Sequence, residues 1–282
     1  MSRAKKSEEM SPAHVEAVRN TKAAAENSYM ESYTYLSAVY DIFMDNIPYD
    51  AWGKFIVSEL KKRGIDDGLI LDLGCGTGIM SEILAGAGYD VIGVDSSAEM
   101  LAVASAKAAE SGNEILYLCQ DMREFELYGT VRAVVSVCDA LNYILEKEEL
   151  VRTFFLVSNY LDPGGVFIFD MTTPAEYEEI ADDVIAENRD ECSFIWENDF
   201  DPESSLNRYD LTLFIRDEAG KYDKYDETHV ERAYTEEEVR AALIEAGLAY
   251  QSSCEDYKNA EPDSLSGRIC YIAGECKKEV KE

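Results

Sequence analysis

Three glycines at alternate positions, Gly74, Gly76 and Gly78, constrain the fold of this chain more than any other feature. An apolar segment at residues 69–73 precedes them and predicts a buried strand, and residues 79–84 resume with apolar side chains at helical spacing. A strand that turns through glycines into a helix places backbone N–H groups and the positive end of the helix dipole at the edge of a sheet. Glycine is needed there because a Cβ would block both the turn and the approach of a ligand. The segment therefore predicts a binding site for a nucleotide-type cofactor.

The spacing of these glycines separates the cofactors that such a loop could bind. Dinucleotide folds use G-x-G-x-x-G, whereas this chain has G-x-G-x-G, and no Lys-Ser or Lys-Thr pair follows to form a phosphate-binding loop. The segment from residue 72 to 78 resembles the first motif of the class I S-adenosylmethionine-dependent methyltransferases. The resemblance implies that S-adenosylmethionine is the cofactor, bound through Asp72, Gly74, Cys75, Gly76, Thr77 and Gly78.

Two acidic residues downstream are placed to bind the nucleoside part of this cofactor. Asp95 ends the second predicted strand, where a carboxylate can accept hydrogen bonds from ribose hydroxyls. Asp121 ends the third, where a carboxylate can accept from the adenine amino group while Met122 flanks the ring. Ser96 and Met100 follow Asp95 as in the family's second motif. The alternatives are that the acids cap helices and that the methionines pack in the core.

The segment that follows the fourth predicted strand is expected to lie where the methyl group and its acceptor meet. Cys138 would offer its backbone there, and Asn142 and Tyr143 are expected to face the cleft. Further candidates for binding the acceptor are Asp170, Arg232 and Tyr234.

An amine acceptor must lose a proton, which requires a base or a path to water. The candidates are His229, Tyr143 and Tyr40. His229 is favoured because the unperturbed pKa of imidazole, roughly 6.5, lies near working pH. The alternative is that His229 faces solvent. Tyr40 could close over the methionine part of the cofactor or pack within its own amphipathic helix, predicted over residues 33–44.

Strands and helices alternate through most of the chain and predict a parallel sheet. The predicted strands are residues 69–73, 90–95, 114–119, 131–137 and 166–170, with two more near 250–257 and 268–276. A capping box at Thr235 opens the helix before these last two. Together with the resemblance, this pattern predicts an α/β, Rossmann-like, doubly wound mixed sheet of seven strands whose last strand is antiparallel.

An acidic region interrupts this pattern and predicts a separate unit. Alternating segments at residues 192–200, 207–216 and 224–234 predict a three-stranded antiparallel insert that lies as a lid over the carboxyl edge of the main sheet. The expected organisation is a helical extension at 1–30, a cofactor-binding domain at 31–174 and 236–282, and the insert at 175–235.

Composition limits the class of partner. The net charge of −31 opposes binding to nucleic acid, which relies on clustered Lys and Arg. No apolar run approaches the ~18 residues of a membrane span and the N-terminus lacks the pattern of a signal peptide, so a cytoplasmic location is expected. The 7 cysteines are expected to be reduced, and with 2 histidines and no C-x-x-C pair a zinc site is not predicted.

The chain is most similar to the small-molecule branch of the family, which includes glycine N-methyltransferases and sugar N,N-dimethyltransferases. The similarity rests on Val39–Phe43, Gln120–Arg123 and Thr228–Val230. It implies in-line transfer of a methyl group to a small-molecule acceptor, with an amine as one candidate, and an insert that often lies at a homodimer contact. The alternatives are a methyltransferase acting on tRNA and a protein that binds the cofactor or its product without catalysis.

Overall fold

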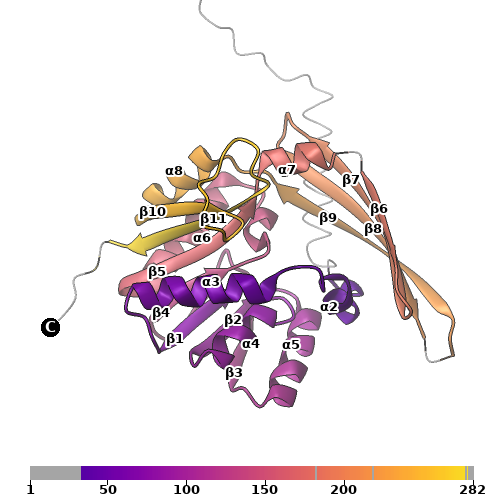
Figure 1. Ribbon diagram of the computed structural model, residues 1–282, viewed down its shortest axis with the longest axis horizontal. Coiled ribbons are helices and arrows are strands. Elements are labelled where there is room, and N and C mark those ends of the chain that lie inside the picture. The colour runs from indigo at the N-terminus through magenta and orange to yellow at the C-terminus, as the bar shows by residue number, and fades with distance from the viewer. Residues whose placement is uncertain (1–32, 182, 218, 277, 279–282) are drawn as a thin grey trace, which may run out of the picture.

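A seven-stranded sheet forms the centre of the molecule (Figure 1). In this computed structural model the described residues are 33–276 and 278, without 182 and 218. The strands of the sheet are β1 (Leu69–Leu73), β2 (Asp90–Asp95), β3 (Ile115–Cys119), β4 (Val131–Ser136), β5 (Leu161–Thr172), β10 (Leu248–Glu255) and β11 (Arg268–Glu275). The helix expected over residues 1–30 lies outside the described residues.

The order of the strands confirms the predicted mixed, Rossmann-like sheet. It is β10-β11-β5-β4-β1-β2-β3, in which β5, β4, β1, β2 and β3 are parallel. The final strand, β11, is antiparallel to both of its neighbours. Because the carboxyl ends of parallel strands meet at one edge, the loops after β1, β2, β3 and β4 lie together there.

Helices cover both faces of the sheet and create two apolar cores, because alternate residues of a strand point to opposite faces. On one face, α3 (Tyr49–Lys62) and α4 (Ile79–Gly86) bury Ile56 in the same core as Ile70. On the other, α6 (Lys147–Tyr160) and α8 (Glu236–Ala246) bury Phe154 with Leu71. Burial on both faces explains why the parallel strands are near-continuous apolar runs. A further helix, α5 (Ala98–Ser111), lies between β2 and β3 in the sequence.

Helix starts and stops follow the local sequence. The capping box predicted at Thr235 is present, with the Thr235 side chain accepting from the Glu238 backbone N–H, and α8 ends at Gly247. The predicted helix over residues 33–44 is wrong as one continuous element. The structure has a 3-10 turn at Leu36–Ala38 and the short α2 (Tyr40–Phe43), because this segment buries its apolar residues against a second sheet.

This second sheet is antiparallel and has four strands where the sequence predicts three. They are β6 (Val184–Asn188), β7 (Cys192–Asp201), β8 (Leu206–Arg216) and β9 (Tyr222–Arg232), in sequence order across the sheet. β6 is an exposed edge strand and lacks the alternation of buried side chains that marks the other three. The sheet extends from the main domain beside α2 and α7 (Pro174–Glu179) (Figure 1).

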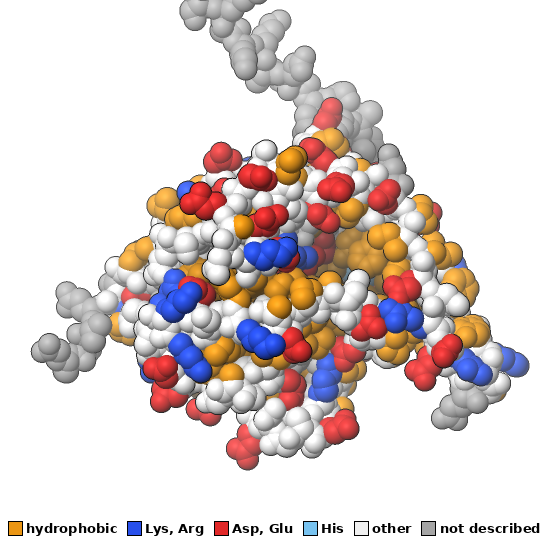
Figure 2. All heavy atoms as spheres, viewed as in Figure 1, with side chains coloured by type: hydrophobic (Ala, Val, Ile, Leu, Met, Phe, Trp, Pro, Cys, Tyr) orange, Lys and Arg blue, Asp and Glu red, His pale blue; other side chains and the backbone are white. Residues whose placement is uncertain are grey.

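Two surface observations bear on the predicted partners. On the face shown in Figure 2, the Lys and Arg side chains are scattered among acidic ones. No helix in the described part of the chain is long and apolar enough to cross a membrane.

Candidate functional site

A pocket opens where the loops after β1, β2, β3 and β4 meet. Most of the predicted cofactor residues line it, and so does Tyr143, a candidate base. Four tyrosines form part of its wall; they come from the segment before α3, from the first residue of α3 and from the loop after β4. The lining residues are Tyr33, Tyr40, Tyr49, Asp72, Gly74, Cys75, Gly76, Thr77, Ile79, Met80, Val94, Asp95, Ser96, Ser97, Met100, Gln120, Met122, Val137, Cys138, Ala140 and Tyr143.

The glycine loop forms the floor of this pocket, and its backbone requires glycine. Gly74 has φ +75°, and a Cβ on it would lie 2.6 Å from the Ala140 Cβ. Gly78 has φ +78°, and a Cβ there would lie 2.4 Å from the Tyr117 hydroxyl oxygen. The side-chain position of Gly78 is thus occupied by Tyr117, so glycine is needed here for packing, and Gly78 does not line the pocket. By contrast, a Cβ on Gly76 would approach only the Met100 side chain, at 3.5 Å, so the backbone at this position faces open space.

Two carboxyl groups face this pocket, the half-buried Asp95 and the fully buried Asp72. Asp95 accepts hydrogen bonds from the backbone N–H groups of Gly76 (2.8 Å) and Ser97 (2.9 Å), and burial raises its pKa. Asp72 accepts from the Ser81 hydroxyl (2.6 Å), while its Oδ1 has no hydrogen-bond partner among the described residues. Burial raises the pKa of Asp72 to about 7. An unpaired carboxyl oxygen in a pocket wall fits a cationic ligand group.

The structure does not place Asp121 in the lining of the pocket. The side chain of Arg123 binds both of its oxygens, with the shortest contact at 2.6 Å, and the Arg123 N–H adds a further bond at 2.8 Å. These bonds outweigh burial and lower the pKa of Asp121. The neighbouring residues Gln120 and Met122 line the pocket instead. The carboxylate of Asp121, which the sequence analysis assigned to adenine, is therefore bound to Arg123, two residues away.

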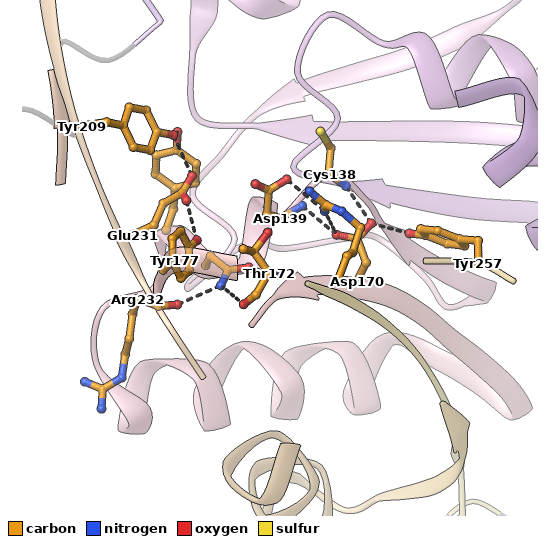
Figure 3. Close-up of polar contacts among 12 residues, drawn as sticks. Cys138, Asp139, Asp170, Thr172, Tyr177, Tyr209, Glu231, Arg232 and Tyr257 are labelled. Carbon is orange, nitrogen blue, oxygen red and sulfur yellow. Dashed lines mark hydrogen bonds and ion pairs between the residues drawn. The ribbon is translucent and has the colours of Figure 1, made fainter. Parts of the chain in front are cut away.

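Three of the predicted acceptor residues instead join the two sheets. The buried Asn142 side chain donates to the backbone oxygens of Thr172 (2.9 Å) and Arg232 (2.8 Å) and accepts from the Thr172 N–H (3.1 Å) (Figure 3). Tyr234 donates to the Ile144 carbonyl, and the Arg232 guanidinium donates to the Leu145 carbonyl. Their polar atoms hold η2 (Ala140–Tyr143) against β5 and β9 and lie outside the pocket lining.

Asp170, the fourth predicted acceptor residue, holds the turn beside the pocket. Its fully buried carboxylate accepts from the N–H groups of Cys138 (2.9 Å) and Asp139 (2.8 Å), from the Tyr257 hydroxyl (2.5 Å) and from Arg268 (2.6 Å) (Figure 3). Cys138 and Asp139 have φ of 59° and 54°, in the left-handed region that non-glycine residues rarely adopt. Asp170 therefore positions this turn and does not reach the pocket.

The candidate bases His229 and Tyr143 lie together. His229 is only 1% exposed, so the alternative that it faces solvent is wrong. Its Nδ1 lies 3.0 Å from the Tyr143 hydroxyl and its Nε2 lies 3.3 Å from Glu227. Burial holds the pKa of Tyr143 well above 10. Tyr40, the third candidate, lines the pocket with Tyr143.

The sequence reasoning missed several residues of this cluster. Tyr33 and Tyr209 lie 2.5 Å and 2.7 Å from the Tyr143 hydroxyl, and Tyr209 donates to the buried Glu231. One signal was available. Glu227, His229 and Glu231 occupy alternate positions of a predicted strand, so their side chains lie on the same face. If that face is buried, three titratable side chains are buried together.

The mixed seven-stranded sheet, the G-x-G-x-G loop and the acid at the end of β2 define the class I methyltransferase fold. Comparisons with known proteins agree. A methyltransferase domain model matches residues 70–165. The putative methyltransferase YqeM of Bacillus subtilis is 35% identical, over 87% of this chain and 98% of that protein. The crystal structure of an S-adenosylmethionine-dependent methyltransferase from Clostridium acetobutylicum has a TM-score of 0.78 at 30% identity, covering 86% of this chain and 98% of that one.

The chain therefore belongs to the S-adenosylmethionine-dependent methyltransferases, and its cofactor is S-adenosylmethionine. A glycine/sarcosine N-methyltransferase of Halorhodospira halochloris is 31% identical over 53% of this chain and 57% of that protein. These findings confirm the family, the fold and the cofactor predicted from the sequence.

Proposed function

We propose that this methyltransferase acts on a small-molecule amine by in-line displacement, with His229 as the base acting through Tyr143. The proposal rests on one contact: the Tyr143 hydroxyl lies 3.0 Å from Nδ1 of the buried His229. Tyr143 also lines the pocket. This contact gives the pocket a route for the proton that an amine must lose.

The residues of the pocket fit the cofactor. The Asp95 carboxylate would hold the ribose hydroxyls, and Gln120 and Met122 would flank the adenine. The unpaired Asp72 Oδ1 would face the cationic amino group of the methionine part. A bound S-adenosylmethionine would supply a methyl group already activated on its sulfonium; the C–S electron pair would stay on sulfur when the acceptor nitrogen takes the methyl group. Besides giving the acceptor proton a route to His229, the wall of the pocket orients the acceptor and excludes water, and such positioning can supply ~7–11 kcal/mol of the barrier.

The hydrogen bonds of Glu227 support the assignment of His229 as a base. The carboxylate accepts from the backbone N–H groups of Tyr33 (2.9 Å), Tyr35 (2.7 Å) and Leu36 (3.0 Å). Burial raises the pKa of Glu227, but the bonds from His229 and this backbone outweigh it and hold the pKa below its usual value. A carboxylate only accepts, so the His229 Nε2 carries the hydrogen and Nδ1 is left to accept a proton from Tyr143.

Charge favours an amine over a phosphate ester. The net charge is −31, and two buried carboxyl groups lie behind the pocket wall: Glu227 accepts from the Tyr33 backbone N–H, and Glu231 accepts from Tyr209, which contacts Tyr143. A phosphate would find no arginine or lysine among the lining residues, whereas an amine would meet the hydroxyl oxygens of the tyrosines and the carboxyl oxygens of Asp72 and Asp95. The partial similarity to a glycine/sarcosine N-methyltransferase also favours an amine.

A panel of acceptors tests the proposal. The purified protein is given methyl-labelled S-adenosylmethionine with glycine, sarcosine, an amino sugar, a catechol, a phosphorylated sugar and bulk tRNA. We expect transfer to at least one amine, and a loss of about 100-fold in kcat in H229N with the affinity for S-adenosylhomocysteine unchanged. Preference for the phosphorylated sugar or tRNA would refute the amine assignment. Binding of the cofactor without transfer to any acceptor would favour the non-catalytic alternative.

Two further predictions concern the second sheet. We propose that residues 175–235 act as a lid on the acceptor side, since His229 and Tyr209 come from β9 and β8. A homodimer through this sheet remains a prediction, which the mass in solution by light scattering tests.

A further inference from the structure

Besides its contact with His229, Tyr143 begins a second path of hydrogen bonds that leads to a buried acid, Glu231. Tyr143 lies 2.7 Å from the Tyr209 hydroxyl, and Tyr209 donates to the Oε1 of Glu231 at 2.7 Å. The other oxygen of Glu231 accepts from Tyr177 at 2.6 Å, so the carboxyl group lies between two phenols (Figure 3). Tyr143 thus connects the pocket to two separate groups that can take up a proton, the imidazole of His229 and the carboxylate of Glu231.

The number of hydrogens on these side chains decides which of the hydrogen bonds between His229 and Glu231 can form at the same time. Each phenol supplies one hydrogen, and an ionised Glu231 only accepts, so the hydrogen of Tyr209 points to Glu231. The contact between Tyr143 and Tyr209 then needs the hydrogen of Tyr143. A neutral His229, with its hydrogen on Nε2 toward Glu227, needs the same hydrogen for its Nδ1. One hydrogen cannot serve both contacts.

With the hydrogen of Tyr33 directed to the Tyr143 oxygen at 2.5 Å, one added proton satisfies the contacts of Tyr143 with both Tyr209 and His229, and it can do so in two places. On the Nδ1 of His229 it donates to Tyr143, which then donates to Tyr209. On Glu231 it reverses the chain, so that Glu231 donates to Tyr209, Tyr209 to Tyr143 and Tyr143 to His229. The two arrangements interconvert when each hydrogen moves to its neighbour, and neither needs a charged phenolate.

We propose that Tyr143, Tyr209 and Glu231 form, with His229, a relay that takes up the proton of the acceptor amine and shares it between His229 and Glu231. This inference rests on the proposed function. The N–H hydrogen of the acceptor passes to the Tyr143 oxygen as the Tyr143 hydrogen passes to Tyr209 and that of Tyr209 passes to Glu231, which becomes a neutral acid. Glu231 is therefore a second proton acceptor, separated from the pocket by two phenols.

The surroundings of Glu231 suit this task. Burial is the largest effect, and with the negative charge of Asp139 it raises the pKa of Glu231 to about 7, against the opposing effects of Tyr177, Tyr209 and Arg268. On its own strand, the nearest titratable groups of the same face are His229 and Glu227. An acceptor that titrates near neutral pH can both take and release a proton during turnover.

Two phenols on the same carboxyl group provide a matched test. Tyr209 and Tyr177 each donate one hydrogen bond to Glu231, but the bond between Tyr143 and Tyr209 is what joins Glu231 to the pocket. Y209F cuts the relay and Y177F leaves it intact. The pH profile of kcat is measured for wild type, Y209F, Y177F and E231Q with glycine, sarcosine and the amino sugar as acceptors. Calorimetry with S-adenosylhomocysteine verifies that each variant is folded.

The relay predicts opposite outcomes for the two phenols. Wild-type kcat falls as the pH drops through about 7, because a protonated Glu231 cannot accept. In Y209F and E231Q we expect kcat to fall about 10- to 100-fold and this limb to disappear. Y177F keeps kcat within about 3-fold and moves the limb to higher pH, because one donor that stabilises the carboxylate is lost.

Each contrary result has a separate meaning. Equal kcat values and profiles in Y209F and Y177F would overturn the relay while leaving methyl transfer to amines established. If Y209F does not fold, an unchanged profile in E231Q overturns it. If the wild type methylates none of the three amines, the proposed function fails and the relay with it.

Discussion

Replacing Asp170 with asparagine tests whether this carboxylate holds the pocket turn. Its Oδ2 accepts from the Cys138 N–H and Tyr257, and its Oδ1 accepts from the Asp139 N–H and Arg268. An amide has one oxygen and one NH2 group, so whichever way D170N is oriented, its NH2 meets a buried backbone N–H. The variant keeps the shape of the side chain but can no longer accept hydrogen bonds from both the Cys138 and the Asp139 N–H groups.

The magnitude follows from these contacts. A buried N–H without a partner costs about 1–3 kcal/mol. Breaking one side of a buried ion pair costs about 3–5 kcal/mol, and the second contact of Arg268, to Asp139 at 3.1 Å, reduces that loss. We therefore expect D170N to lower the free energy of unfolding by about 3 kcal/mol, taking the lower end of that range. For a chain of this size this corresponds to a fall in Tm of about 6–12 °C.

Thermal unfolding and calorimetry measure both consequences. The turn at Cys138 and Asp139 lines and supports the pocket in a left-handed conformation that costs about 1–2 kcal/mol per residue, so without Asp170 it relaxes and S-adenosylhomocysteine binds more weakly. Y257F is the matched control, because it removes one bond and leaves the other three, with an expected loss of about 1 kcal/mol. If D170N and Y257F have the same Tm and the same affinity for S-adenosylhomocysteine, the Asp170 carboxylate is not what holds the turn.

Two further predictions concern the cofactor pocket. G74A is expected to abolish binding of S-adenosylhomocysteine, because residue 74 has φ +75° and the added Cβ would lie 2.6 Å from the Ala140 Cβ. The control G86A, where a Cβ in the helix meets nothing within 4 Å, should bind normally. Equal affinities of the two variants by calorimetry would contradict this. Binding should also release protons, because a cationic amino group beside Asp72 favours the carboxylate of a group whose pKa is about 7, so that affinity rises as the pH rises through that value. Calorimetry at pH 6.5 in buffers of different ionisation enthalpy should detect this release in wild type and not in D72N; release that persists in D72N would assign it elsewhere.

What the sequence predicts well is local. The glycine loop, the acid at the end of β2 and the capping box at Thr235 depend on neighbours within a few residues, so their spacing carries the information. The five parallel strands are apolar enough to be recognised in the sequence, whereas the mixed sheet of seven strands was predicted with the help of the resemblance to the family. β6 was missed because an exposed edge strand has no buried face to set a period.

The polar residues of the site depend on distant partners, and there the sequence is a poor guide. Asn142 and Asp170 are polar residues near the ends of strands, which suggested that they bind the acceptor. Their partners Thr172, Arg232 and Arg268 lie 30 to 98 residues away, and only the folded chain shows that these bonds use up the polar atoms. Asp121 shows the opposite case, since Arg123 stands two residues away and could have been recognised as its partner.

In the proposed function, the two sheets have separate roles. The groups placed to hold the cofactor come from the edge of the seven-stranded sheet, whereas Tyr209, His229 and Glu231 come from β8 and β9. Tyr143 belongs to the first sheet's loop and must meet the second at 2.7 to 3.0 Å, so the way the sheets join has to be fixed to within a fraction of an ångström. The three hydrogen bonds of the Asn142 side chain, one residue before Tyr143, fix that junction. Because the proposed acceptor side is built on separate strands, we expect substitutions in β8 and β9 to alter the choice of acceptor while leaving the cofactor pocket intact.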